Sequence, residues 1–292
     1  SYHNLRAMTT AAAKESALRE RVRLATSALI GFSGGVDSTY LLAVAHAELG
    51  SRVAALTADS PSLARATLAE AQAFCASRNI VHHIVPTDEF SDPAYTANDG
   101  QRCYHCKAAL LGVMRMLGAR AEAGSELWIG AITDDLADWR PGMRAANERG
   151  ATFPLAEAGM TKADIRERSR ALGLPTWDRP AEPCLSSRVP YGEAVTPEAV
   201  RMIEAAEVLL RSLGLRTCRA RHHQIGAGAN GGARGWLCRI EVPEDDLPRA
   251  LAQRRAIVEG LARIGYANAT LDLAGLASGG FNRLLAAQER SA

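Results

Sequence analysis

Apolar and polar positions alternate in blocks along the first half of the chain. Four short apolar runs occur, at Ala28–Phe32, Val53–Ala58, Ile80–Val85 and Leu127–Ala131. Around them, apolar residues recur every three or four positions, over Ala11–Ala25, Thr39–Leu49, Leu63–Arg78 and part of Asp99–Arg120. The runs predict buried strands and the periodic segments predict helices. This order predicts an α/β fold with a doubly wound parallel sheet and helices on both faces.

The second half of the chain has a different pattern. Pro180, Pro183 and Pro190 lie in a stretch without periodicity, where we place a domain boundary. Beyond it we predict helices over Thr196–Leu213 and Asp246–Arg263, and strands at Arg216–His223, Trp236–Val242 and Ala269–Leu273. We therefore expect an α/β domain of residues 1–185, in which residues 1–10 are a tag or disordered. A smaller α+β domain of residues 186–292 would bind substrate and form oligomers.

Composition narrows the class of protein. The 292 residues are 47% hydrophobic and 23% charged, with a net charge of +2, as in a soluble globular protein without a nucleic-acid-binding surface. No apolar run approaches the roughly 20 residues of a membrane span, and the start lacks the apolar core of a signal peptide. Six cysteines in such a chain are more typical of thiols, metal ligands or catalysts than of disulfides. We expect a cytoplasmic protein without membrane or nucleic-acid partners.

The segment Ser33–Ser38, with the sequence SGGVDS, follows the first predicted strand and opens a helix. Its two glycines let the backbone approach an anion, and the helix start offers unpaired N–H groups and a positive dipole end. The segment matches neither the Walker A pattern nor the dinucleotide fingerprint. A Gly-Gly pair alone is usually only a turn, and Asp37 can serve as a helix cap. In this strand–helix context the hexapeptide predicts a phosphate-binding loop.

Two further segments carry cysteines. Cys103 and Cys106 lie three residues apart at a helix start, a spacing typical of a zinc half-site, a redox pair or buried structural thiols. Cys184 lies in a loop bounded by prolines, four residues before Arg188. A guanidinium so close favours the thiolate form, so Cys184 is a candidate nucleophile, with buried packing as the alternative.

Arg219 and Arg221 alternate along a predicted strand, so their side chains share one face and can bind one anion. A solvated strand face is the simpler interpretation. Cys75, Cys218 and Cys238 lie in periodic apolar segments and are expected to be packing residues.

The loop SGGVDS resembles the pyrophosphate loop of the PP-loop ATP pyrophosphatases, which have a HUP-like fold and adenylate carbonyl or carboxyl oxygens. The resemblance narrows to the LarE family through Ile129–Asp135 with Arg140–Gly142, Pro154–Lys162, Cys184–Gly192 and Leu271–Asn282. It covers about Ala28 to Asn282; the glycine-rich segment Ile225–Gly235 departs from the family's pattern.

The resemblance implies an enzyme and its substrate. Members of the LarE family are ATP-dependent sulfur transferases that convert carboxylates of pyridinium-3,5-biscarboxylic acid mononucleotide to thiocarboxylates. The product leads to the nickel-pincer nucleotide cofactor of lactate racemase. ATP replaces a poor leaving group, oxide, with AMP.

The resemblance and the strand ends also imply site residues. ATP and pyrophosphate would be bound by Ser33, Gly34, Gly35, Asp37, Ser38, Ala58, Ser60, Gly130 and Asp135, with Asp37 organising Mg²⁺. Substrate would be bound by Lys107, Arg188, Arg219 and Arg221, the last two at its phosphate. Glu207 and Glu241 correspond loosely to acidic residues that bind metal or substrate.

The sulfur source has two forms in this family. In the sacrificial form, Cys184 displaces AMP and then gives up its own sulfur, which leaves dehydroalanine. In the other form, three cysteines hold a [4Fe–4S] cluster whose open iron carries a sulfide, and Cys103, Cys106 and Cys184 match that pattern. We favour the cluster form.

Other functions compete with this interpretation. A tRNA thiolase would be strongly basic or carry an RNA-binding module, and an amidotransferase would need an ammonia source; the chain indicates none of these. A nucleotide-binding regulator would have no need of Cys184 beside Arg188. We also expect a homo-oligomer.

Overall fold

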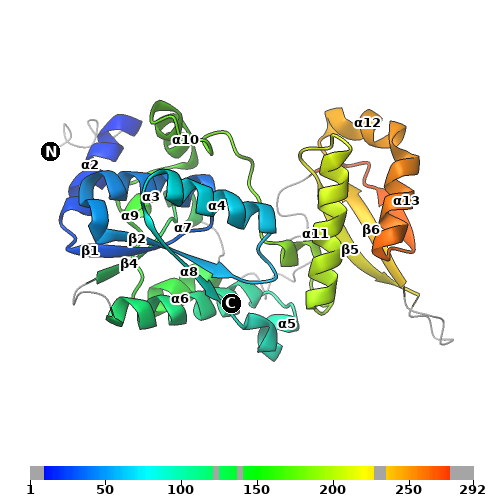
Figure 1. Ribbon diagram of the computed structural model, residues 1–292, viewed down its shortest axis with the longest axis horizontal. Coiled ribbons are helices and arrows are strands. Elements are labelled where there is room, and N and C mark those ends of the chain that lie inside the picture. The colour runs from blue at the N-terminus through cyan, green and yellow to red at the C-terminus, as the bar shows by residue number, and fades with distance from the viewer. Residues whose placement is uncertain (1–9, 121–124, 137–140, 227–234, 277–292) are drawn as a thin grey trace. The chain divides into compact units, whose positions relative to one another are not determined.

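The computed structural model describes residues 10–120, 125–136, 141–226 and 235–276 (Figure 1). They divide into two compact units. The first contains the described residues up to Glu89 together with Cys103–Glu182, and the second contains Phe90–Arg102 and the described residues from Pro183 on. Residues 1–9, Arg140, most of the glycine-rich segment and the tail motif at residues 278–282 lie outside the described part of the chain. Thr10 already caps the first described helix.

The described strands of the first unit form one parallel sheet with the order β3-β2-β1-β4. Their bounds are Ser27–Gly31 for β1, Val53–Asp59 for β2, Val81–Pro86 for β3 and Ser125–Ile129 for β4. Each predicted strand is present, within two residues of the expected bounds. The prediction of a parallel sheet is confirmed.

Helices cover both faces of this sheet, as Figure 1 shows. The first face packs against α2 (Ala11–Arg23), α3 (Val36–Leu49), α4 (Arg65–Ser77) and α10 (Lys162–Ala171), and the second against α6 (Arg102–Arg120) and α8 (Pro141–Glu148). In β1, Ala28 and Ile30 belong to the first core and Leu29 belongs to the second. Successive side chains of a strand point to opposite faces, so the apolar run of β1 supplies both cores.

Several helices of the first unit were not predicted. They are the short α7 (Thr133–Leu136) and α9 (Pro154–Glu157), together with α8 and α10. In α10 the only buried apolar side chain is Ile165, so apolar periodicity gives almost no signal there. Its start does carry one: Thr161 and Asp164 form a capping box that a search for helix starts would have found.

The second unit contains a small mixed sheet. β5 (Arg219–Ile225) pairs antiparallel with β6 (Gly235–Glu241), which pairs parallel with β7 (Asn268–Leu271). Helices α11 (Pro197–Ser212), α12 (Leu247–Ala252) and α13 (Arg254–Ile264) supply further core residues. The start of α11 is as predicted, because the Thr196 side chain accepts from the Ala199 N–H and proline follows. The single helix predicted over Asp246–Arg263 is wrong: the helix breaks at Gln253.

Residues 90–102, with the short α5 (Pro93–Thr96), belong to the second unit, although they fall inside the range expected for the first domain. The Tyr95 hydroxyl lies 2.9 Å from the Ser186 hydroxyl, and Asn98 Nδ2 donates to the carbonyls of Pro190 and Glu193 at 2.7 and 2.9 Å. These bonds attach the segment to residues far along the chain. The domain boundary at 185/186 stays a prediction.

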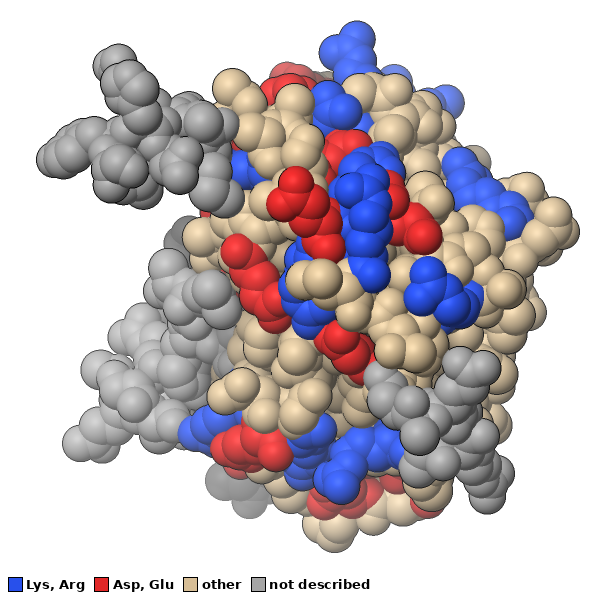
Figure 2. All heavy atoms as spheres, turned by 90° about the vertical axis from the view of Figure 1, so that its left-hand side faces the viewer, with Lys and Arg blue, Asp and Glu red and all other residues tan. Residues whose placement is uncertain are grey.

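The face of the molecule in Figure 2 mixes acidic and basic side chains. On α2, Arg19 pairs with Glu15 and Glu48, and Arg21 pairs with Glu126 and Glu157. Basic side chains of α2 are thus paired with carboxylates. None of the helices within the described residues has the length and hydropathy needed to cross a membrane.

The remaining short elements are 3-10 helices: η1 (Gly50–Arg52), η2 (Glu89–Ser91), η3 (Leu185–Arg188) and η4 (Glu244–Asp246).

Candidate functional site

The loop Ser33–Ser38 connects β1 to α3. Hydrogen bonds of its own serine hydroxyls hold it in a tight turn. The hydroxyls of Ser33 and Ser38 lie 3.1 Å apart, and the Ser38 hydroxyl donates to the Gly35 carbonyl at 3.2 Å. Gly34 has a φ of 70°, in the left-handed region that favours glycine. A Cβ there would meet only ordinary contacts at 3.5 Å, so the backbone conformation, rather than space, requires glycine.

A cavity of about 240 Å³ lies beside this loop. It is bordered by the loop itself and by residues at the carboxyl ends of β2 and β4, the edge at which parallel sheets bind ligands. Seven of the residues predicted to bind nucleotide or substrate line it: Ser33, Gly35, Asp37, Ser38, Ala58, Lys107 and Gly130.

Gly130 allows β4 to end close to the loop. A Cβ at Gly130 would lie 3.0 Å from both the Cα and the N atom of Ser38, closer than most real Cβ atoms approach backbone, so the loop would have to shift. The first turn of α3 and the end of β4 therefore form one wall of the cavity.

Three residues predicted to bind ATP or pyrophosphate, Gly34, Ser60 and Asp135, do not line this cavity. The buried Ser60 accepts from the Ser62 N–H at 3.0 Å, which stabilises the turn after β2. Asp135 accepts from the Ile132 N–H at 3.1 Å, and its charge acts on Asp37. Gly34 lines a different cavity, on the side of α4.

Asp37 forms a two-point ion pair with Lys162, the first residue of α10. Lys162 Nζ donates to both carboxylate oxygens, at 2.9 and 2.8 Å. Burial raises the pKa of Asp37 above its ordinary value, Lys162 opposes this shift, and the nearby Asp135 adds to it. The sequence alone gives no sign of this role of Lys162, because Lys162 lies 125 positions from Asp37 and no spacing rule connects them.

The first turn of α6 carries both cysteines of the C-x-x-C segment. Cys103 is exposed and Cys106 is half-buried, and the spacing of three puts them on one side of the helix. Lys107, the next residue, lines the cavity at the phosphate loop. The alternative that these cysteines are buried structural thiols is therefore wrong for Cys103.

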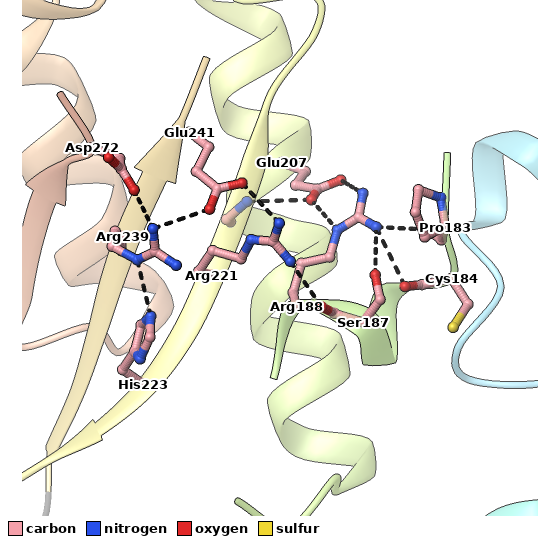
Figure 3. A network of polar contacts seen from close by, with 11 residues as sticks. Pro183, Cys184, Ser187, Arg188, Glu207, Arg221, His223, Arg239, Glu241 and Asp272 are labelled. Carbon is pink, nitrogen blue, oxygen red and sulfur yellow. Dashed lines mark hydrogen bonds and ion pairs between the residues drawn. The ribbon is translucent and has the colours of Figure 1, made fainter. Parts of the chain in front are cut away.

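Cys184 belongs to the second unit and directly precedes η3. Its side chain is exposed, which rules out the packing alternative. Arg188 does not bond the thiol: it donates to the backbone carbonyls of Pro183 at 2.6 Å and Cys184 at 3.3 Å, and to the Ser187 hydroxyl at 3.0 Å (Figure 3). Arg188 thus holds the backbone on which Cys184 is carried.

The remaining donors of Arg188 bind Glu207. Arg188 Nε lies 2.7 Å and Nη2 3.3 Å from the two carboxylate oxygens, and both side chains are almost fully buried. Glu207 also accepts from Arg211 at 2.9 Å and from the Ala220 N–H at 3.3 Å. Arg188 was predicted to bind substrate and Glu207 to bind metal or substrate. In this structure the two side chains bond each other and neighbouring protein groups.

Arg219 and Arg221 are buried in β5, at 5% and 3% exposure, so the interpretation as a solvated strand face is wrong. Arg221 donates to the Ser187 carbonyl at 2.9 Å and to Glu241 at 2.8 Å. Burial lowers the pKa of Arg219, as do the neighbouring cations Arg221 and Arg188. The two arginines therefore lie close together, beside η3.

The network around these arginines extends across the neighbouring strand β6 to the end of β7. Glu241 also pairs with Arg239, which bonds Asp272 and His223 (Figure 3). Five guanidinium groups, those of Arg188, Arg211, Arg219, Arg221 and Arg239, face three carboxylates, those of Glu207, Glu241 and Asp272.

The six cysteines fall into two groups. Cys75, Cys218 and Cys238 are buried, as predicted, and burial raises the pKa of Cys75 to about 11 and that of Cys238 to about 12. The other three are at least partly accessible. Within the described ranges no group of three or more His, Cys, Asp or Glu side chains is arranged to hold a metal ion. Cys103 and Cys106 belong to the first unit and Cys184 to the second.

Comparison with known proteins places the chain among nucleotide-using enzymes. Residues 27–101 match the family described as queuosine biosynthesis protein QueC, and they include the phosphate loop. An NH(3)-dependent NAD(+) synthetase of Mannheimia succiniciproducens is 29% identical over 152 residues, 50% of this chain and 60% of the relative.

Two relatives cover nearly the whole chain. An uncharacterized protein of Synechocystis sp. is 42% identical over 260 residues, 88% of this chain and 92% of the relative. The pyridinium-3,5-bisthiocarboxylic acid mononucleotide synthase of Lactiplantibacillus plantarum is 31% identical over 279 residues, 95% of this chain and 97% of the relative.

The charges around Asp37 predict its titration. In Asp135→Asn the pKa of Asp37 falls, because a negative neighbour that opposes ionisation is removed. In Lys162→Met it rises, because the cation that favours the carboxylate is lost. Carbon-detected NMR of the aspartate carboxyl groups across a pH series measures both shifts. Asp134→Asn is the matched control: an asparagine oxygen can still accept from the Lys162 N–H. Shifts of the same sign in the two variants would contradict the assignment.

The buried pair of Arg188 and Glu207 predicts a large effect on stability. Arg188→Met leaves a carboxylate in the interior without its main partner and is expected to lower the free energy of unfolding by about 3–5 kcal/mol. Arg211→Met removes a more exposed partner of the same carboxylate and should cost about 1 kcal/mol or less. Urea denaturation compares the two variants. Equal losses would show that Arg188 does not anchor this network.

Proposed function

The chain belongs to the LarE family, and from this premise we propose that it is an ATP-dependent sulfurtransferase acting on pyridinium-3,5-biscarboxylic acid mononucleotide. The main support for this proposal is the 31% identity to the Lactiplantibacillus plantarum synthase over 95% of the chain. The proposed product is the thiocarboxylate used to make the nickel-pincer nucleotide cofactor of lactate racemase. The cavity beside the phosphate loop supports the ATP-dependent half of the reaction.

ATP activates the carboxylate in the first proposed step. A carboxylate oxygen attacks the α-phosphorus, the bond from that phosphorus to the bridging oxygen breaks, and pyrophosphate leaves. The Gly35 N–H, the hydroxyls of Ser33 and Ser38 and the start of α3 supply donors for the phosphates. Lys107 and Lys162 add positive charge at the cavity and at Asp37. These donors would stabilise charge on the departing pyrophosphate.

Mg²⁺ is part of this proposal. The carboxylates of Asp37 and Asp135 are hard oxygen ligands of the kind that Mg²⁺ takes, and Asp135 lies close enough for its charge to raise the pKa of Asp37. Lys162 balances the charge of Asp37 in the structure. Bound Mg²⁺ would neutralise phosphate charge, and Asp37 would hold and orient it.

Sulfur enters in the second proposed step. In the sacrificial route, the thiolate of Cys184 attacks the carbonyl carbon of the acyl adenylate, AMP leaves, and a thioester forms. A base then removes the Cα proton of Cys184 and the bond from Cβ to sulfur breaks. The substrate keeps the sulfur as a thiocarboxylate and residue 184 becomes dehydroalanine. The exposure of Cys184 supports this role.

We favour a sulfur donor held by Cys103, Cys106 and Cys184. These are the three accessible thiols of the six, and thiolates are the ligands of iron–sulfur clusters. A [4Fe–4S] cluster on three thiolates would supply an iron with an open position for an exchangeable sulfide. In this route the protein contributes the three ligands, and Cys184 survives turnover.

The second unit would bind the phosphate of the mononucleotide. Arg219 and Arg221 lie close together on β5, and guanidinium groups bind phosphate through paired N–H donors. Glu207 and Glu241 would then act by holding these arginines in place. A cytoplasmic location and a homo-oligomer are further proposals; the first is supported by six cysteines without a disulfide.

A turnover assay tests the proposed function. With ATP, Mg²⁺ and the dicarboxylate nucleotide, wild-type protein should form AMP, pyrophosphate and sulfur-bearing product. Asp37→Asn should lower the rate of pyrophosphate–ATP exchange by about a hundredfold or more, because the Mg²⁺ that neutralises phosphate charge would lose its carboxylate ligand. Cys184→Ala should keep the exchange and lose the product. Formation of ADP, or turnover independent of the dicarboxylate, would overturn the proposal.

The cysteine variants separate the two sulfur sources. If the three thiols hold a cluster, Cys103→Ala and Cys106→Ala abolish product formation, and anaerobically purified protein contains iron and sulfide. Cys75→Ala, at a buried thiol, is the control. If those two variants keep full turnover, the cluster route is wrong. A loss of about 34 Da at Cys184, the mass of H₂S, would then identify the sacrificial route.

A further inference from the structure

The phosphate loop is contacted by Arg179, a residue that no motif in the sequence singles out. Arg179 Nη1 donates to the Gly34 carbonyl at 2.8 Å. Its other terminal nitrogen forms an ion pair with Glu70 of α4. The side chain of Arg179 therefore spans from the loop to the helix that packs on this face of the sheet. All three residues belong to the first unit.

The bond reaches one particular peptide group. The Gly34 carbonyl and the Gly35 N–H belong to the same planar peptide, so the direction of one determines the direction of the other. Gly34 lines a cavity of about 450 Å³ on the α4 side, where Arg179 also lies, whereas Gly35 lines the cavity at the phosphate loop. This peptide thus separates the two cavities.

Glycine alone does not determine the orientation of this peptide. With no Cβ, Gly34 adopts positive and negative φ values at similar cost, so its φ of 70° needs an outside contact to hold it. Within the loop, the Gly35 N–H has only a long bond to the Ser33 hydroxyl, at 3.4 Å. A charge-assisted bond from Arg179 is stronger, and it also polarises the peptide, which makes the Gly35 N–H a better donor.

Arg179 is itself held firmly. Its N–H donates to the Thr176 carbonyl at 3.1 Å, and its carbonyl accepts from Arg166 Nη2 of α10 at 2.9 Å. Leu174, which begins this turn, is buried in the core of the first unit. A side chain anchored at its backbone can transmit a fixed position to the loop.

We propose that Arg179 is a positioning residue of the phosphate loop: it holds the Gly34–Gly35 peptide so that the Gly35 N–H stays directed at the β- and γ-phosphates of ATP. This inference rests on the proposed use of ATP. Arg179 acts through the peptide and contacts no reacting atom.

Calorimetric binding of pyrophosphate and of AMP, each with Mg²⁺, tests the inference. Arg179→Met should weaken pyrophosphate binding about tenfold and leave AMP binding within about twofold, since AMP lacks the β- and γ-phosphates. Arg179→Lys should lie between, because one ammonium cannot bond the carbonyl and Glu70 in the fork geometry of a guanidinium. Glu70→Gln should have a small effect, because Glu70 is 56% exposed.

Arg78→Met is the matched control. Arg78 lines the same cavity, where it stacks on the Phe74 ring at 4.2 Å, and none of its bonds reaches the loop. The Arg78→Met variant should bind pyrophosphate and AMP with the affinities of the wild-type protein. Equal losses in the variants of Arg78 and Arg179, or an equal loss of AMP and pyrophosphate binding, would overturn the inference.

The two proposals fail differently. Wild-type protein that binds pyrophosphate but forms no sulfur-bearing product contradicts the proposed function and leaves the role of Arg179 standing. Wild-type protein that turns over, with unchanged pyrophosphate affinity in Arg179→Met, contradicts only the role of Arg179.

Discussion

The first turn of an α-helix leaves N–H groups without partners in the helix, and the first unit is organised around that constraint at α3. The loop Ser33–Ser38 supplies two hydroxyls, Lys162 neutralises Asp37, and Arg179 binds the Gly34 carbonyl. Gly130 keeps a neighbouring strand end close to the same turn. These contacts come from four separate parts of the chain, and the loop that they hold borders a cavity at the carboxyl edge of the sheet.

The second unit is constrained instead by several buried arginines, whose charges must be compensated inside the protein. An isolated buried charge costs several kcal/mol, so each guanidinium must find carboxylates or carbonyls. Glu207 pairs with Arg188, and Glu241 pairs with Arg221. Arg188 also bonds the backbone carbonyl of Cys184. These bonds make the network a structural core of the second unit.

Burial separated the cysteines in a way that the sequence anticipated. Cys75, Cys218 and Cys238 lie in apolar periodic segments and are inside, whereas Cys103 and Cys184 follow no such pattern and are exposed. The burial of Arg219 and Arg221 could not be predicted in this way. The alternation of Arg219 and Arg221 suggested a shared face, which is correct, but alternation cannot distinguish a solvated face from a buried one. That depends on which carboxylates lie opposite, and Glu241 comes from the neighbouring strand.

The sequence by itself determined the parallel sheet, the phosphate loop and the family, because these depend on local periodicity and on contiguous motifs. Strands β1 to β4 and the start of α11 were found within a few residues. Tertiary structure alone decided the partners: Lys162 for Asp37, Arg179 for Gly34, Glu207 for Arg188. The members of the first two pairs are separated by more than a hundred positions, and no local spacing encodes such contacts. They exist only because the sheet brings its strand ends, and the helices beside them, to one place.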